Sequence, residues 1–467
     1  MPLVAGVDSS TQACKVVVRD AESGRLVRHG RAAHPPGTEV DPELWWRALQ
    51  RATLEAGGLD DVAALSIAGQ QHGLICLDHD GHVVRDALLW NDTRSADAAS
   101  SLTSELAPAD WVARVGSLPV ASLTISKLRW LAEHEPANAD RTAAVCLPHD
   151  WLTWRLRPRL GIDQLTTDRS DASGTGYFDC VSNTYCADLV QLAFGRDDVQ
   201  LPRVVGPHSP CGEARGALLG PGVGDNAAAH LGLDAGTDMV VSLGTSGVVM
   251  TRHHEQTHDL TGLVTGFADA SDAYLPLACT LNAARVLDAT ARVLSVSLAQ
   301  LSSLAHSAPA GAEGVVVVPY FEGERTPNRP DATAAIHGLT LSNATAPNIA
   351  RAAVEGILCG LTAGLRAMTD QGIPVSRVIL IGGAAASPAV REIAPTIFGV
   401  PVVAPAPGEY VADGAARQAA WTLAGSHQPP TWGLDTAFER FEAPLRVDVL
   451  ERYREAATHY LDRRSAY

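Results

Sequence analysis

Four short segments of the sequence carry residue types that could handle a phosphoryl group: residues 8–11, 69–73, 222–226 and 242–247. In the first of them, Asp8 ends an apolar run and is followed by three small hydroxyl residues. A carboxylate beside such a turn can hold a hydrated Mg²⁺ while the amides of the turn face phosphate oxygens. The last segment supplies a second turn of small residues that can approach phosphates closely. Taken alone, Asp8 could equally be a turn or cap residue.

A second carboxylate, Asp225, lies in a glycine-containing loop next to Asn226 and just before the apolar residues 227–231, which favour a helix. Two interpretations are open for it. As a helix cap it would have only a structural role. As a general base it would take a proton from a hydroxyl that attacks a phosphoryl group. The presence of the other three segments favours the second interpretation.

The residues around these segments predict the elements that must position them. Residues 3–7 form an apolar run, residues 9–13 a turn and residues 15–19 a β-branched run, which together predict a hairpin. A helix follows Asp41, and residues 62–68 form another apolar strand that ends at the second segment. Strands, a helix and a further strand predict a mixed α/β architecture.

A similar hairpin recurs in the middle of the chain. Residues 239–243 and 248–251 are predicted strands that flank the small residues 244–247. The two hairpins are about 240 residues apart, whereas short-period repeats recur every 20–50 residues. This spacing indicates two related halves, although any two hairpins with Ser, Thr and Gly in their turns would look alike.

The last third of the chain predicts a possible nucleotide site. Apolar residues from Val354 to Met368 recur at steps of three and four, which predicts a long helix, and residues 378–381 form a buried strand. Gly382 and Gly383 follow this strand. A strand, a glycine turn and a helix N-terminus together can hold an anion or nucleotide. The same pattern also makes an ordinary tight connection.

Together these segments resemble the FGGY family of carbohydrate kinases, nearly from end to end of the chain. The motifs that carry the resemblance are residues 6–11 (GVDSST), 41–46 (DPELWW), 69–73 (GQQHG), 89–94 (LWNDTR), 171–175 (DASGT), 224–228 (GDNAA), 242–248 (SLGTSGV), 323–327 (GERTP) and 380–383 (LIGG). The resemblance implies an α/β fold of two ribonuclease-H-like domains of the actin and hexokinase type, with ATP and sugar bound between them. We expect these domains to span residues 1–235 and 236–467.

The resemblance also implies roles for individual residues. Asp225 is expected to be the catalytic base, and Asp8 to be oriented toward Mg²⁺, through water, and toward the phosphates. The expected sugar contacts are Gln71, His72 and Asn226. The expected contacts to ATP are Thr11 and Lys15 from the first hairpin, Gly244 and Thr245 from the second, and Gly382 and Gly383 at the adenosine.

The implied reaction is the ATP-dependent conversion of D-xylulose to D-xylulose 5-phosphate. Gln71 stands where family members that use this sugar often have Met, and it adds hydrogen-bonding capacity at the sugar. Ala384 stands where the adenosine loop usually has a third glycine. The alternatives are a kinase of the same family for ribulose, gluconate or glycerol, and a non-catalytic actin-like ATPase.

A different signature, H-E-x-x-H at residues 254–258, is typical of zinc peptidases but requires both histidines on one helix face. The residues around it lack helical periodicity and follow a predicted strand. We therefore do not expect a zinc site there.

Composition narrows the choice of partners and compartment. The chain has 467 residues and a net charge of −16; lysine occurs only at positions 15 and 127, and neither follows a glycine, which excludes a P-loop. No basic run and no apolar run of about 18 residues occurs, so we expect neither nucleic acid nor membrane as a partner. The first residues do not resemble a signal peptide, and eight scattered cysteines suggest a reduced, cytoplasmic protein. The resemblance allows a homodimer.

Overall fold

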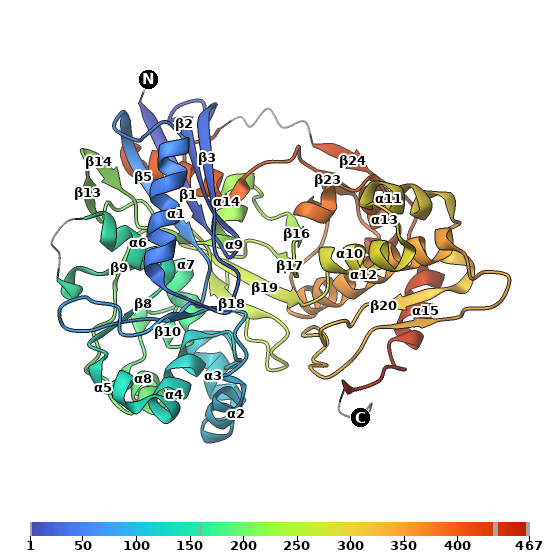
Figure 1. The fold of residues 1–467 in the computed structure, drawn as a ribbon, viewed down its shortest axis with the longest axis horizontal. Helices are drawn as coiled ribbons and strands as arrows, with labels where there is room; N and C mark the ends of the chain where they lie inside the picture. The colour runs from blue at the N-terminus through green and yellow to red at the C-terminus, as the bar shows by residue number, and fades with distance from the viewer. Residues whose placement is uncertain (1, 158–160, 433–437, 464–467) are drawn as a thin grey trace.

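The computed structural model describes residues 2–157, 161–432 and 438–463 of the chain. These residues form two α/β lobes, each built on a mixed seven-stranded sheet. Figure 1 shows the two lobes side by side, with the strands labelled β18 and β19 running between them. This architecture confirms the expected fold of two related α/β halves.

The sheet of the first lobe has the strand order β13-β14-β5-β1-β2-β3, with β15 attached to β5. Strands β1, β2 and β3 form an antiparallel meander, and β5 runs parallel to β1. The strands are β1 (Leu3–Ser9), β2 (Ala13–Asp20), β3 (Leu26–Ala33), β5 (Val62–Gly69), β13 (Gly212–Ala214), β14 (Ala217–Leu219) and β15 (Val223–Gly224). The predicted hairpin and the predicted strand 62–68 are thus confirmed.

The sheet of the second lobe repeats this arrangement, in the order β18-β19-β17-β16-β22-β23-β24. Here β16, β17 and β19 form the antiparallel meander, and β22 runs parallel to β16. The strands are β16 (Met239–Leu243), β17 (Gly247–Met250), β18 (Thr265–Ala268), β19 (Tyr274–Thr280), β22 (Val378–Ile381), β23 (Val402–Ala404) and β24 (Glu439–Phe441). The shared topology confirms that the two hairpins belong to related halves.

Helices cover these sheets, and short strands lie in the connections. The helices of the first lobe are α1 (Pro42–Glu55), α2 (Ala96–Glu105), α3 (Pro108–Val115), α4 (Thr124–His134), α5 (Pro136–Arg141), α6 (Pro148–Leu156), α7 (Arg169–Ala172), α8 (Ala187–Phe194) and α9 (Asp225–Leu233). Those that follow are α10 (Ala284–Leu294), α11 (Leu298–Ser307), α12 (Ala346–Asp370), α13 (Pro388–Phe398), α14 (Tyr410–Ala424) and α15 (Val447–Ala456). The short strands are β4 (Glu39–Val40), β6 (Ile75–Leu77), β7 (Ala87–Leu88), β8 (Ala144–Cys146), β9 (Thr166–Asp168), β10 (Phe178–Asp179), β11 (Thr184–Tyr185), β12 (Arg203–Val205), β20 (Val316–Val318) and β21 (Ala335–His337).

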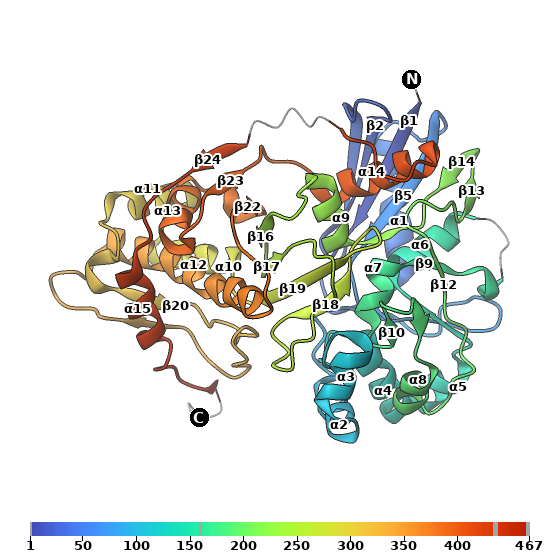
Figure 2. The same cartoon turned by 180° about the vertical axis from the view of Figure 1, so that it is seen from behind.

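Helix α14 comes from the last part of the chain but packs on the first lobe, across β1 and beside α9, as Figure 2 shows. The approach is close because small residues line it. A Cβ added at Gly6 of β1 would lie 2.0 Å from the Ala412 oxygen, and one at Gly414 would lie 1.9 Å from the Ala228 oxygen. The helix therefore fixes α9 relative to β1, and these two elements carry Asp225 and Asp8.

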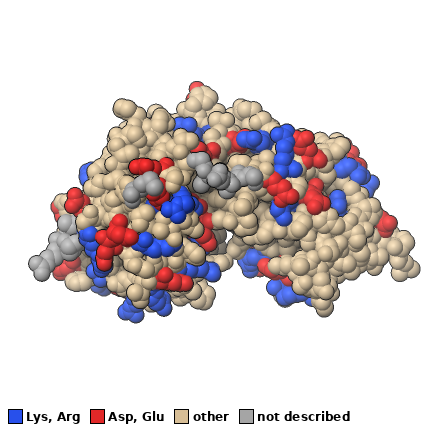
Figure 3. Space-filling model, turned by 90° about the horizontal axis from the view of Figure 1, so that it is seen from above, with Lys and Arg blue, Asp and Glu red and all other residues tan. Residues whose placement is uncertain are grey.

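Three further expectations can be compared with the fold. Residues 254–258 lie outside helices, as expected, so their histidines do not share a helix face. All eight cysteines are free. Among the described residues, no helix is long and apolar enough to cross a membrane. Figure 3 shows acidic and basic side chains interspersed over one face of the molecule.

Candidate active site

The turns of the two hairpins meet between the lobes. The side-chain amide of Gln12, in the β1–β2 turn, donates a hydrogen bond of 3.4 Å to the Thr245 hydroxyl in the β16–β17 turn. Next to Gln12, the Thr11 hydroxyl accepts a 2.8 Å hydrogen bond from the Trp90 indole. The structure thus brings together two turns that are more than 230 residues apart in the sequence.

Asp8 lies at the end of β1, and its side chain is only 2% exposed. It accepts a hydrogen bond from the Ser10 hydroxyl, and the ammonium group of Lys15 lies 3.4 Å from its Oδ2. Lys15 also forms a 2.5 Å ion pair with Glu409, just before α14. Burial raises the pKa of Asp8, although the charge of Lys15 opposes that rise. Lys15 therefore points toward Asp8 and shares its charge between two carboxylates.

The neighbourhood of Asp8 suits a magnesium ion bound mainly through water. The Ser9 hydroxyl is buried there without a hydrogen-bond partner among the described residues. Within residues 2–157, 161–432 and 438–463, the only group of three or more close His, Cys, Asp or Glu ligands is Asp78, Asp80 and His82, which does not include Asp8. One carboxylate, completed by water and phosphate oxygens, is the kind of site that Mg²⁺ prefers.

Asp225 is the first residue of α9, so the helix begins two residues earlier than the apolar pattern predicted. Its Oδ1 accepts hydrogen bonds from the backbone nitrogen of Asn226 at 2.9 Å and from the side-chain amide at 3.1 Å. Burial, and then the negative charge of Asp8, raise the pKa of Asp225 to about 7. A carboxylate with this pKa can accept a proton near neutral pH.

A chain of amides links Asp225 to the loop after β5. The Asn226 amide donates to Gln71 Oε1 at 2.9 Å, and the Gln71 amide donates to the Ser170 oxygen at 3.4 Å. The Gln71 side chain is buried, and both ends of its amide contact protein. Gln71 therefore orients Asn226. The hydrogen-bonding capacity that the sequence led us to expect of Gln71 is used in contacts within the protein.

His72 lies in the same loop with a left-handed backbone conformation, φ 68°. Its Nδ1 lies 2.6 Å from the Gly174 oxygen, so Nδ1 carries the proton and Nε2 is left as a hydrogen-bond acceptor. Burial, and then the charge of Lys127, lower the pKa of His72 to about 3. The ring is therefore neutral at physiological pH and can accept a hydrogen bond from a hydroxyl group.

Lys127, the second of the two lysines, was not among the predicted site residues. Its fully buried ammonium group donates to the His72 oxygen at 2.8 Å and also to the Ser122 oxygen. Burial lowers its pKa to about 7. The rarity of lysine in this chain was the one signal in the sequence that could have pointed to it.

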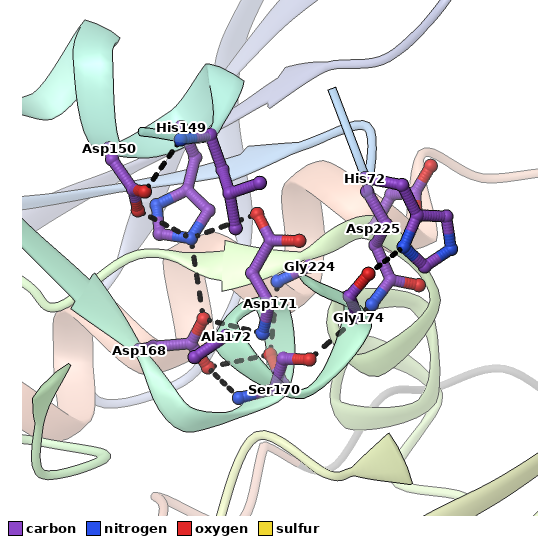
Figure 4. A network of polar contacts seen from close by, with 12 residues as sticks. His72, His149, Asp150, Asp168, Ser170, Asp171, Ala172, Gly174, Gly224 and Asp225 are labelled. Atoms are coloured by element: carbon purple, nitrogen blue, oxygen red, sulfur yellow. Dashed lines mark hydrogen bonds and ion pairs between the residues drawn. The ribbon is translucent and has the colours of Figure 1, made fainter. Parts of the chain in front are cut away.

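A buried charge cluster around His149 also escaped the sequence analysis. Figure 4 shows three carboxylates around its Nε2: Asp150 and Asp168 at 3.3 Å and Asp171 at 3.2 Å. Burial alone would lower the pKa of His149, but the three carboxylates raise it to about 9. Asp168 also caps α7, whose Ser170 hydroxyl accepts a hydrogen bond from the Gly224 nitrogen at 3.0 Å. The cluster thus supports the loop that precedes Asp225.

Gly382 and Gly383 follow β22 and differ in what surrounds them. A Cβ at Gly382, where φ is 92°, would lie 2.6 Å from the backbone of Leu243, whereas one at Gly383 would meet nothing within 4 Å. Gly244, in the second turn, is almost as open, with only the Ser246 oxygen at 3.6 Å. The Ala384 methyl group is buried in the core of the second lobe, so it does not project from the loop.

Comparisons with known proteins agree with the duplicated architecture. The N-terminal domain of the FGGY family of carbohydrate kinases matches residues 3–247, and the C-terminal domain of that family matches residues 239–423. A xylulose kinase of Streptomyces rubiginosus is 43% identical over 91% of this chain and 89% of its own length. A xylulose kinase of Escherichia coli is 34% identical over 84% of each chain. The crystal structure of a xylulose kinase from Bifidobacterium adolescentis superimposes with a TM-score of 0.89 at 48% identity, over 98% of this chain and 99% of that one.

Proposed function

The chain belongs to the FGGY family of carbohydrate kinases, and from this premise we propose that it transfers the γ-phosphoryl group of ATP to D-xylulose, giving D-xylulose 5-phosphate and ADP. The substrate assignment is supported by xylulose kinases that are 43% and 48% identical over nearly the whole chain. The arrangement of Asp225, Asn226 and His72 provides the single observation that supports the site most strongly. The pKa of Asp225 is raised to about 7, Asn226 donates to it and to Gln71, and His72 in the same loop as Gln71 is a neutral hydrogen-bond acceptor.

In this proposal Asp225 takes the proton from the terminal hydroxyl of the sugar as that oxygen attacks the γ-phosphorus. The new bond joins the sugar oxygen to phosphorus, and the bond from phosphorus to the β,γ-bridging oxygen breaks to release ADP. His72 Nε2 accepts a hydrogen bond from another sugar hydroxyl. Asn226, held by Gln71, lies beside the base and orients the sugar.

The two hairpin turns hold the nucleotide phosphates. Their backbone amides, with the Thr11 and Thr245 hydroxyls, face the phosphate oxygens, and Lys15 adds a positive charge next to Asp8. Magnesium, held near Asp8 through water, would neutralise charge on the β- and γ-phosphates. Gly383, with open space where a side chain would be, lets the adenosine approach the backbone.

The substrate assignment can be tested with a panel of sugars in a coupled assay of ADP release. We expect kcat/KM to be highest for D-xylulose, and at least tenfold lower for D-ribulose, gluconate and glycerol. A higher kcat/KM for any of these would move the assignment to that substrate within the same family. ADP release that does not depend on any sugar would contradict kinase function and favour an actin-like ATPase.

A further inference from the structure

The loop at residues 323–327 lies against the end of β19 in the second lobe and is held there by a buried carboxylate. Glu324 is 4% exposed and accepts hydrogen bonds from the Leu281 nitrogen at 2.7 Å and the Asn282 amide at 3.0 Å. Asn282 also donates to the Gly323 oxygen at 2.6 Å. Two residues just beyond the end of β19 thus fix the start of the loop.

A second set of contacts ties the loop to β19 itself. The Thr326 hydroxyl donates to the Cys279 oxygen at 2.7 Å, and the next residue of β19, Thr280, donates to the Gly247 oxygen of β17 at 3.5 Å. Gly247 closes the β16–β17 turn, which faces the phosphates in the proposed function. The loop and this turn are therefore fixed to the same end of one strand.

Arg325 lies between these two anchors, and its charge acts on residues of the proposed site. Its charge acts on His72, adding to the lowering of the pKa by burial and Lys127. Burial raises the pKa of Cys279, and Arg325 opposes that rise while Asp225 adds to it. The Cys279 thiol also interacts with Ser246 of the second turn. The charge of Arg325 thus acts on His72 in the sugar loop and on Cys279, a residue that Asp225 and Ser246 of the second turn also affect.

Arg325 is half-buried, yet only its backbone nitrogen donates a hydrogen bond, to Glu324, and its guanidinium group forms no hydrogen bond or ion pair with the residues that the structure describes. This is unusual in a chain with 52 acidic residues and 36 basic ones. Arg329, two residues beyond this loop, is exposed and lies over the Tyr460 ring at 5.2 Å. A half-buried arginine without a partner is best satisfied by an anionic ligand, because its planar group matches phosphate oxygens in pairs.

We propose that Arg325 is a further catalytic residue of this enzyme, and that its guanidinium group contacts the phosphoryl group while it passes from ATP to the sugar. This inference rests on the proposed kinase function. In the step described above, the proton goes to Asp225 and the electron pair of the broken bond goes to ADP. Arg325 forms no covalent bond; it stabilises negative charge on the non-bridging oxygens, which persists in the sugar phosphate.

The position of Arg325 favours the phosphoryl group over the sugar or the adenosine. Among its neighbours, His72 is a neutral acceptor suited to a hydroxyl group, and Asp225 needs its own charge to act as a base. The phosphoryl group is the reactant that brings negative charge to the point between Asp225 and the second turn. A guanidinium group there complements Lys15, which lies on the side of the first turn, and the magnesium ion that Asp8 would hold through water.

The test compares Arg325→Met and Arg325→Lys with the matched control Arg329→Met. For each we would measure kcat, the unfolding temperature, and the dissociation constants of D-xylulose and D-xylulose 5-phosphate. We expect Arg325→Met to lower kcat by about 10²–10³-fold, as is typical when one donor to a transition-state charge is removed. It should bind D-xylulose 5-phosphate at least tenfold more weakly and D-xylulose within threefold of the wild type.

The other variants separate this role from a structural one. Arg325→Lys should have an intermediate kcat, because an ammonium group keeps the charge but not the paired hydrogen bonds. Arg329→Met should match the wild type, and all variants should unfold near the wild-type temperature, because Glu324 and Thr326 hold the loop. An Arg325→Met kcat within threefold of the wild type would overturn the inference, as would equal losses of affinity for the sugar and its phosphate. If instead the wild type phosphorylates no sugar, the proposed function itself fails.

Discussion

Burial shifts the pKa values of His72 and Asp225 in opposite directions, because it favours the neutral form of each side chain. It keeps His72 neutral by lowering its pKa to about 3, and with Asp8 it raises the pKa of Asp225 to about 7. A carboxylate with its ordinary pKa would be a weak base toward a hydroxyl group, whereas one near 7 is better matched to the task. The cost of burying Asp225 is therefore linked directly to its proposed function.

This pKa gives a pH dependence with a definite sign. Because a raised pKa keeps Asp225 protonated at lower pH, only about a tenth of the enzyme has the free carboxylate at pH 6. We expect kcat/KM for D-xylulose, at saturating ATP, to fall tenfold per pH unit below about 7 and to level off above it. His72 stays neutral over this range and should add no second slope. A flat profile between pH 5 and 8 would contradict the assignment of Asp225 as base.

At the scale of elements, strand ends and turns position most of the proposed contacts, whereas Asp225 and Asn226 begin a helix. The sequence predicted the two hairpins and the strand 378–381 correctly, because each is a local pattern of apolar runs and small residues. It could not predict that His149 collects Asp150, Asp168 and Asp171, since their approach depends on how α6, β9 and α7 pack. The buried Lys127 was missed for a similar reason, because one of the carbonyl groups that hold it belongs to His72, 55 residues away in the sequence.

The loop after β22 gives a prediction at this scale. Gly383→Val should leave the unfolding temperature unchanged, because its side chain would enter open space, but it should raise KM for ATP at least tenfold. Gly382→Val is the matched control. It should lower the stability of the fold by about 1–3 kcal/mol, because the new side chain would overlap Leu243 and strain the backbone. Thermal unfolding and ATP titration would separate the two effects. An unchanged KM for Gly383→Val would mean that this loop does not face the nucleotide.

At the scale of the whole molecule, the two lobes supply different parts of the proposed site. The first carries Asp8, His72 and Asp225, and the second carries the facing turn and Arg325. We expected the two domains to meet between residues 235 and 236. Helix α14 lies beyond that boundary in the sequence but packs on β1 and α9 of the first lobe. Its face of small residues shows why it packs closely, but that pattern alone does not indicate which lobe it contacts. Glu409, just before this helix, reaches Lys15 and so links the end of the chain to the first hairpin.

The formation of D-xylulose 5-phosphate by the wild type and by Asp225→Asn, at pH 8 with ATP and Mg²⁺, tests the central claim most directly. Asparagine keeps the shape of the side chain but cannot accept the proton. Phosphorus NMR should show rapid product formation by the wild type and a rate lower by about 10²–10⁴-fold for the variant. The variant should unfold at the wild-type temperature or above it, because a buried charge has been removed. A folded Asp225→Asn enzyme that forms the sugar phosphate at the wild-type rate would contradict the account.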